Sequence, residues 1–191
     1  MADTPRTAAQ LLAAFADGQA AGSILPQDMR DLVVSLEPPH GEVHIVTPIE
    51  TSVAAANTFY KCLGTTSLSG SEHLVDDGTI GPGAASNRLS YTGDLTDVHM
   101  MIAITISFTT ATNNQIIAFR IAKDGVTEAT SEVQRKSGTG TDQGSVTLLT
   151  LVTLDNTNYI ELYGANVTGT STDNFTIQKM TILGLGFFHF G

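Results

Sequence analysis

The sequence lacks residues on which several classes of protein depend. It has no tryptophan and a single cysteine, Cys62, among 191 residues. One cysteine excludes an intrachain disulfide framework, so Cys62 is a small buried hydrophobe, a nucleophile or half of an intermolecular bridge. Basic residues are also few, because nine Lys and Arg oppose 19 Asp and Glu, for a net charge of -10. A nucleic-acid groove needs clustered Lys and Arg, so we expect no nucleic-acid partner.

Long apolar runs and targeting signals are missing as well. No stretch approaches the roughly 20 consecutive apolar residues of a membrane span, and we expect no membrane partner. The N-terminus has no basic region followed by an apolar run, which predicts synthesis in a cytoplasm.

Motifs that carry catalysis are not found either. There is no Gly-x-Ser-x-Gly elbow to expose a nucleophile, and the glycine-rich turns lack the Lys and helix start of a phosphate loop. His40 and His44 have helical spacing, but the surrounding Pro and Gly preclude a stable helix. The acidic loop at residues 72–77 and His189 could hold an ion, although a solvated turn and a surface histidine are the simpler interpretation. We therefore expect a protein without catalytic activity, without a bound metal and without a cofactor.

The clearest pattern that is present lies at residues 98–123. Alternate positions from Val98 to Phe108 are apolar, which is the period of a strand with one buried face. After a polar break, residues 117–121 repeat the pattern. The two runs predict an antiparallel hairpin with one face in a core.

Shorter apolar runs predict further strands, separated by stretches rich in Gly, Ser and Asp such as residues 64–72 and 76–87. Residues 128–135 are polar and predict a weak edge strand. About eight to ten short strands with such turns indicate a two-sheet antiparallel sandwich. The predicted strands are 43–49, 57–63, 88–92, 98–108, 117–123, 128–135, 146–154, 159–163 and 175–190.

The first 40 residues predict two short helices. Thr7 and Gln10 have the spacing of a capping box, and Pro26 suits the first position of a second helix over residues 27–36. Two such helices bury too little surface to stand alone, so they pack on the body of the chain, a sister subunit or another protein. We expect a helical anchoring segment at 1–40 and a sandwich domain at 41–191. The predicted anchoring residues are Leu11, Phe15, Met29, Leu32, Val33 and Leu36.

The last three strands are apolar on both faces, whereas a half-exposed antiparallel sheet needs only one apolar face. Helices or loops of the same chain could cover the second face, or identical subunits could bury it. The sequence offers too few helices to cover a sheet, which favours an oligomer. The predicted intersubunit residues are Leu149, Leu151, Tyr159, Tyr163, Met180 and Ile182.

Several segments resemble a known family. Residues 119–125, 144–148 and 154–162, with the closing apolar strand, resemble the trimeric jelly-roll domains of tumour-necrosis-factor and C1q type. More narrowly, they resemble the versions in tailed-bacteriophage virion proteins, such as head fibres, capsid decoration proteins and tail-associated fibres. Residues 7–36 are similar to the segment that often precedes that domain. Residues 155–158 depart from the family's usual Gly-Asp turn, and no collagen-like tract is present.

The resemblance implies a homotrimer with the second sheet face around the threefold axis. It further implies a non-catalytic structural protein of the virion, made in the host cytoplasm, whose partners are itself and capsid or tail proteins. The alternative is a receptor-binding adhesin that recognises a host glycan or protein through loops such as residues 109–114, although these are small and polar. A sandwich-fold hydrolase, the third hypothesis, would need a pocket with paired acids or a nucleophile.

Overall fold

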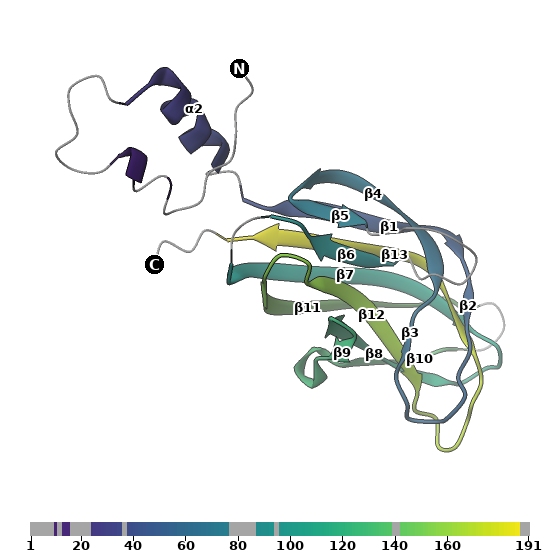
Figure 1. The fold of residues 1–191 in the computed structure, drawn as a ribbon. Helices are drawn as coiled ribbons and strands as arrows, with labels where there is room; N and C mark the ends of the chain where they lie inside the picture. Colours follow the sequence, from purple (N-terminus) through teal and green to yellow (C-terminus); the bar gives the residue numbers. More distant parts are fainter. Residues whose placement is uncertain are drawn as a thin grey trace.

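The computed structural model describes residues 10, 13–15, 24–35, 38–76, 87–93, 96–138 and 142–187. Two antiparallel sheets lie face to face, and a short helical segment precedes them (Figure 1). Sheet I has the order β11-β7-β13-β1-β4, with β2 beside β13; sheet II has the order β10-β8-β12-β6-β5, with β3 beside β12 and β9 beside β8. Sheet I contains β1 (His40–Pro48), β2 (Glu50–Thr51), β4 (Gly64–Glu72), β7 (Val98–Thr110), β11 (Gly144–Leu154) and β13 (Phe175–Gly186). Sheet II contains β3 (Tyr60–Lys61), β5 (Leu74–Asp76), β6 (Arg88–Tyr91), β8 (Ile116–Lys123), β9 (Val126–Thr127), β10 (Val133–Lys136) and β12 (Tyr159–Asn166).

The strand order is that of a jelly roll. From β6 in sheet II the chain crosses to β7 in sheet I and returns to β8 and β10; it then crosses to β11, returns to β12 and ends in β13. The last long strand lies between β7 and β1, so the beginning and end of the sandwich pair with each other. Eight strands wound between two sheets in this way form a jelly roll. The predicted mainly β, antiparallel jelly-roll sandwich is therefore confirmed.

Residues 98–123 form two strands but not the predicted hairpin. β7 pairs with β11 and β13 in sheet I, whereas β8 pairs with β10 and β12 in sheet II. Residues 111–115 carry the chain from one sheet to the other. The predicted pairing is wrong, because two strands that face one core from opposite sheets show the same one-sided pattern as a hairpin.

One strand of sheet I lies where we expected only turns. β4 pairs with β1 at the edge of the sheet, and of its side chains Leu68 packs against the core. Its Ser- and Thr-rich sequence lacks an alternating pattern, which edge strands can do without. The predicted strand at 57–63 is reduced to β3. The one at 128–135 begins as a 3-10 turn, Ala129–Ser131, before β10.

An aromatic cluster joins the two sheets in the core. Phe119 of sheet II packs edge to face on Phe108 and Phe175 of sheet I, with ring centroids 5.0 Å and 5.8 Å apart. All three rings are buried. Gly164 on β12 makes room for them, because a Cβ atom there would lie 2.5 Å from Cζ of Phe175. This cluster fixes the spacing of the sheets that carry the surface described below.

Cys62 follows β3 and lies in the same core. Its side chain is fully buried, and burial raises the pKa of the Cys62 thiol well above its usual value. The small buried hydrophobe is the interpretation that fits, because a nucleophile or an intermolecular bridge needs an accessible thiolate.

The helix α2 (Pro26–Ser35) begins at the predicted proline. The backbone N–H of Leu25 donates to Oδ2 of Asp28 at 2.8 Å, which closes the first turn. Figure 1 shows α2 beyond the end of the sandwich at which β1 begins, away from both sheet faces. Gln10 is also helical, but Thr7 and much of the first predicted helix lie outside the described residues. The division at residue 40 stays a prediction.

Candidate functional site: the outer face of sheet I

The predicted intersubunit residues do not form one surface. Leu149 and Leu151 lie on the outer face of sheet I, where their side chains are 61% and 72% exposed. Met180 and Ile182 are buried in the core, so their assignment to an intersubunit surface is wrong. A register shift in β13 between Ile177 and Lys179 is the reason, because one extra residue exchanges the faces of everything that follows it. The outward apolar residues of β13 are therefore Leu183 and Leu185.

Tyr159 and Tyr163 lie on the outer face of the other sheet and make contacts within the chain. The guanidinium of Arg88 stacks over the Tyr159 ring, 4.6 Å from its centroid. Desolvation, with the nearby Glu161 carboxylate, raises the pKa of the Tyr163 hydroxyl. These two tyrosines therefore belong to a half-buried polar cluster on sheet II, separate from Leu149 and Leu151.

The outer face of sheet I carries two apolar rows. Strand register places Leu149 beside Ala103 and Ala103 beside Leu183. The next row has the same form, from Leu151 through Met101 to Leu185. Neighbouring strands lie roughly 4.8 Å apart, so the residues within a row are direct neighbours across the sheet. Beyond the second row, the backbone N–H of Phe187 donates to the carbonyl of His99 at 2.8 Å. We call this surface the apolar face; it comprises Met101, Ala103, Leu149, Leu151, Leu183, Leu185 and Phe187.

The other half of the same sheet surface is polar but uncharged, apart from one lysine. Thr147, Thr105 and Thr181 form one cross-strand row, and Ser145 and Ser107 meet Lys179 in the next. A shallow hollow of about 500 Å³ lies over these rows. Its lining residues are His44, Ile45, Thr105, Ile106, Ser107, Ser145, Lys179, Met180 and Thr181.

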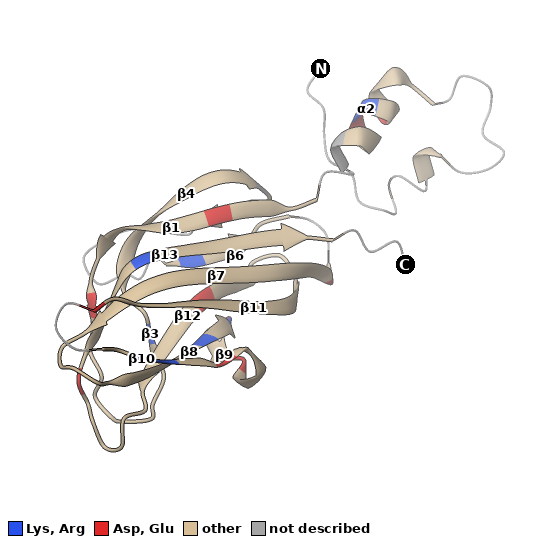
Figure 2. Cartoon of the chain, turned by 180° about the vertical axis from the view of Figure 1, so that it is seen from behind, with Lys and Arg blue, Asp and Glu red and all other residues tan. Residues whose placement is uncertain are grey.

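Charge is almost absent from the middle of sheet I. Strands β7 and β11 contain no Asp, Glu, Lys or Arg, and β13 contains only Lys179. Figure 2 shows β7 and β11 without a charged residue on this side. The chain as a whole has 28 charged residues, so their absence from these strands is a property of this surface. The sequence contains this signal as the absence of Asp, Glu, Lys and Arg from residues 98–110 and 144–154, which a search for apolar periodicity does not detect.

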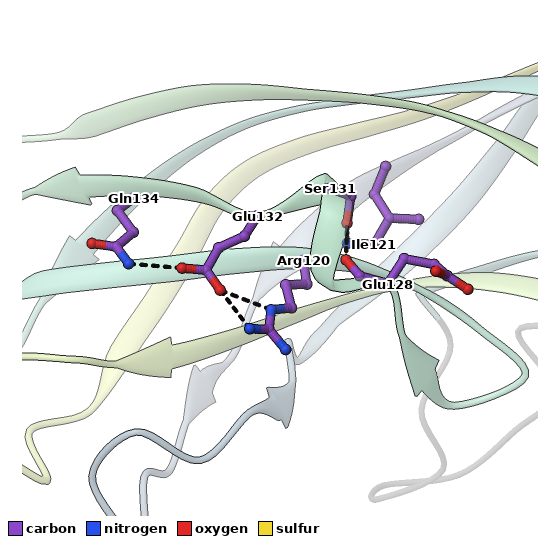
Figure 3. Close-up of polar contacts among 6 residues, drawn as sticks. All are labelled: Arg120, Ile121, Glu128, Ser131, Glu132 and Gln134. Atoms are coloured by element: carbon purple, nitrogen blue, oxygen red, sulfur yellow. Dashed lines mark hydrogen bonds and ion pairs between the residues drawn. The ribbon is translucent and has the colours of Figure 1, made fainter.

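Sheet II presents the opposite character. Nε and Nη2 of Arg120 donate to Oε2 of Glu132 at 2.8 Å and 2.6 Å, and Nε2 of Gln134 donates to its other carboxylate oxygen at 2.7 Å (Figure 3). Ser131 in the 3-10 turn accepts from the backbone N–H of Ile121 and donates to the carbonyl of Glu128. Lys61 pairs with the buried Glu161. The carboxylates of Glu132 and Glu161 on this sheet are therefore paired with basic groups of the same chain.

The Glu132 network predicts a pH-dependent contribution to stability. The hydrogen bonds from Gln134 and then from Arg120 lower the pKa of Glu132. A lowered carboxyl pKa adds stability above the ordinary glutamate value of about 4.3, and that contribution disappears as the pH falls through the lowered pKa. Glu132→Gln is therefore expected to cost about 1 kcal/mol of unfolding free energy at neutral pH. The cost stays small because the Glu132 side chain is partly exposed to water. Urea denaturation of both proteins at pH 7 and pH 3 should show the difference shrink with acid; a constant difference would contradict this role.

Helix α2 presents an apolar stripe. Leu25, Met29 and Val33 are spaced four residues apart and are all exposed, Val33 by 68%. Two of the predicted anchoring residues, Met29 and Val33, thus lie on an accessible surface.

The other predicted anchoring residues are placed differently or not described. Phe15 and Leu32 are half-buried. Leu11 and Leu36 lie outside the described residues. Their role as anchors stays a prediction.

Within the part of the chain that the structure describes, no three His, Cys, Asp or Glu residues are grouped so that they could hold a metal ion. Asp77 and His189, two of the candidate ion ligands, lie outside that part. Among the same described residues, none of the helices is long and apolar enough to cross a bilayer.

The fold and the surface together define an antiparallel jelly-roll protein with one partly apolar sheet face that carries few charges. Solved structures that are similar to it include the following two. The Eiger TNF protein from S. frugiperda has a TM-score of 0.49 and 9% sequence identity, over 81% of this chain and 96% of that one. The PRD1 vertex protein P5 has a TM-score of 0.43 and 9% identity, over 78% of this chain and 97% of that one. No family model and no curated protein matches the sequence.

Proposed function

We propose that this chain is a non-catalytic structural protein of a phage particle. Three copies associate through the outer face of sheet I, and the N-terminal helical segment docks the trimer to the capsid or tail. The jelly roll then projects outward as a decoration or fibre. The threefold symmetry and the phage setting of this proposal come from the sequence resemblance; the choice of surface comes from the structure.

One observation carries the choice of surface, the combination of apolar rows with missing charge on sheet I. Leu149 and Leu151 are exposed in a single chain and lie beside Met101, Ala103 and Leu185 in continuous rows. Large exposed apolar patches mark interaction sites, and the buried centres of interfaces are depleted of charged residues. A chain of net charge -10 repels its own copies, so contact is least costly where charges are absent.

Coverage of this face by the same chain is not supported by the placement of the helix. α2 lies beyond the end of the sandwich, and of the described helices none lies over sheet I (Figures 1 and 2). A second copy is the occupant that fits, because every copy of the chain offers this apolar surface and closed symmetry uses it in all of them.

The mass of the purified protein tests the association. Sedimentation equilibrium should give three times the 20.1 kDa of one chain. A monomer at micromolar concentration would overturn the proposal of a homotrimer.

Docking through the helical segment predicts that Val33→Asp leaves the trimer intact and abolishes attachment. Val33 is 68% exposed on α2, and an aspartate there would place an unpaired charge in an apolar contact with the particle. Purified variants are added to particles that lack the protein, and bound protein is counted by electron microscopy. Val126→Asp, an equally exposed position on β9, is the matched control and should attach normally.

Two results would count against docking. Attachment of Val33→Asp at the wild-type level would exclude α2 as the anchor. Binding of the wild-type protein to host cells, with none to the depleted particles, would favour the adhesin alternative.

A further inference from the structure

Two opposite charges lie on strands β1 and β13 of the outer face of sheet I, and a third charged residue, Glu50 on the short strand β2, accepts a hydrogen bond from Nδ2 of Asn174. Across strands β1, β7, β11 and β13, the charged residues are Glu42 on β1 and Lys179 on β13. Neither forms a hydrogen bond or an ion pair with another residue that the structure describes. Figure 2 shows one acidic band on β1 and one basic band on β13.

The two groups are too far apart to pair within one chain. Glu42 is in register with Leu183 on β13, and Lys179 lies four residues from Leu183 on the same strand. At about 3.4 Å per residue this is a separation of roughly 13 Å along the sheet. On these four strands, one positive and one negative group are therefore without a partner among the residues that the structure describes.

The surroundings of Lys179 solvate an ammonium group but do not neutralise it. The side chain lies on the rim of the hollow of about 500 Å³, whose other members include Thr105, Ser107 and Thr181. His44 also faces this hollow, and no carboxylate lines it. If the face is buried between subunits, an unpaired ammonium loses its water without gaining a counter-charge, which is costly. Glu42 is half-buried beside the apolar row that contains Leu183. Its carboxylate would likewise lose water on burial without gaining a counter-charge.

We propose that Lys179 of one copy forms an ion pair with Glu42 of the next copy across the trimer interface. This inference rests on the proposed function. In a ring of three, each copy supplies one lysine to one neighbour and one glutamate to the other, so three identical pairs close the assembly. The apolar face supplies the area, and the ion pair selects the register and the correct partner surface.

A charge swap tests the pair. Lys179→Glu and Glu42→Lys are each expected to weaken trimer formation by ~10-fold or more in sedimentation equilibrium, because each leaves two like charges facing across the interface. The double variant, Lys179→Glu with Glu42→Lys, restores the opposite charges in exchanged positions and should return to within a few-fold of the wild-type association constant.

The effect of net charge on association must be separated from the effect of the ion pair, and Lys136 on β10 provides the control. Lys136→Glu makes the chain more acidic by the same amount as Lys179→Glu, but it is exposed on sheet II and should leave association unchanged. Glu42→Lys separates the two effects further. It makes the chain less acidic, so net charge alone would strengthen the trimer, whereas loss of the pair weakens it.

Three results would overturn the ion pair. The first is that neither single charge reversal changes the association constant. The second is that Glu42→Lys associates more tightly than wild type, and the third is that the double variant does not regain the wild-type association constant. None of them affects the trimer itself: if these variants behave as wild type while Leu151→Asp dissociates, the ion pair is wrong and the interface stands. If Leu151→Asp also remains trimeric, the proposed interface is wrong.

Discussion

Leu151→Asp is expected to dissociate the trimer into monomers. Leu151 is 72% exposed in one chain and stands in the row that continues through Met101 to Leu185. In a trimer closed through sheet I, the substitution places three carboxylates in a dry apolar contact. An unpaired charge buried in this way costs ~3–5 kcal/mol, enough to shift the association constant by about two to almost four orders of magnitude. Sedimentation velocity at micromolar concentration measures the change.

The control for this substitution is Val126→Asp. Val126 on β9 is 68% exposed, so it matches Leu151 in character and accessibility but lies on the other sheet. It should remain trimeric. Both variants should keep the far-ultraviolet circular dichroism of a β protein, because neither side chain belongs to the core. A folded Leu151→Asp protein that sediments as a trimer would exclude this face as the interface.

Phe119→Ala is expected to remove most of the stability of the sandwich. The Phe119 ring is fully buried and contacts Phe108 and Phe175 edge to face. This one side chain of sheet II therefore packs against two strands of sheet I. Phe→Ala changes in a core cost ~3–5 kcal/mol, because transfer energy is lost and a cavity remains. A domain of this kind has only about 5–15 kcal/mol in total. Urea denaturation, with all proteins at one concentration, measures the loss.

Phe119→Leu separates ring packing from general hydrophobicity. Leucine keeps much of the volume, so this variant should lose less than half as much stability as Phe119→Ala. A loss below about 1 kcal/mol for Phe119→Ala would mean that the core closes over the gap and that the aromatic cluster does not set the spacing of the sheets.

The sequence predicted individual strands better than it predicted their partners. The alternation in β7 identified its buried face correctly, since Met100, Ile102 and Ile104 are all in the core. Which sheet a strand joins depends on contacts with residues far away in the chain, and a one-sided pattern is the same in either sheet. The hairpin prediction failed for this reason, and β4 was missed because an edge strand of Ser and Thr has no pattern to recognise.

The candidate interface was predicted in part. Leu149 and Leu151 were found because β11 keeps strict alternation, so the second apolar face could be read directly. In β13 the register shift before Lys179 exchanges the two faces, and simple counting then selects Met180 and Ile182 in place of Leu183 and Leu185. A bulge of one residue leaves no mark in the hydrophobic pattern of a strand that is apolar on both sides.

The surface of sheet II shows the limit of composition-based reasoning. Tyr159 and Tyr163 are typical interface residues, yet in this chain they contact Arg88 and Glu161 of the same subunit. Arg88 lies on β6, and Glu161 lies on β12 between the two tyrosines. The distribution of charge separates the two sheets. Sheet II carries ion pairs within one chain, whereas the central strands β7 and β11 of sheet I contain no Asp, Glu, Lys or Arg.

Hydroxyl-radical footprinting of the wild-type protein tests the interface most directly, because it compares two side chains in one sample. Leu151 and Val126 are 72% and 68% exposed in a single chain and should react at similar rates if the protein is monomeric. A trimer closed through the outer face of sheet I predicts that Val126 is oxidised readily and that Leu151 is protected, with protection lost on dilution below the dissociation constant. Equal oxidation of the two residues in a protein with the mass of a trimer would contradict this interface.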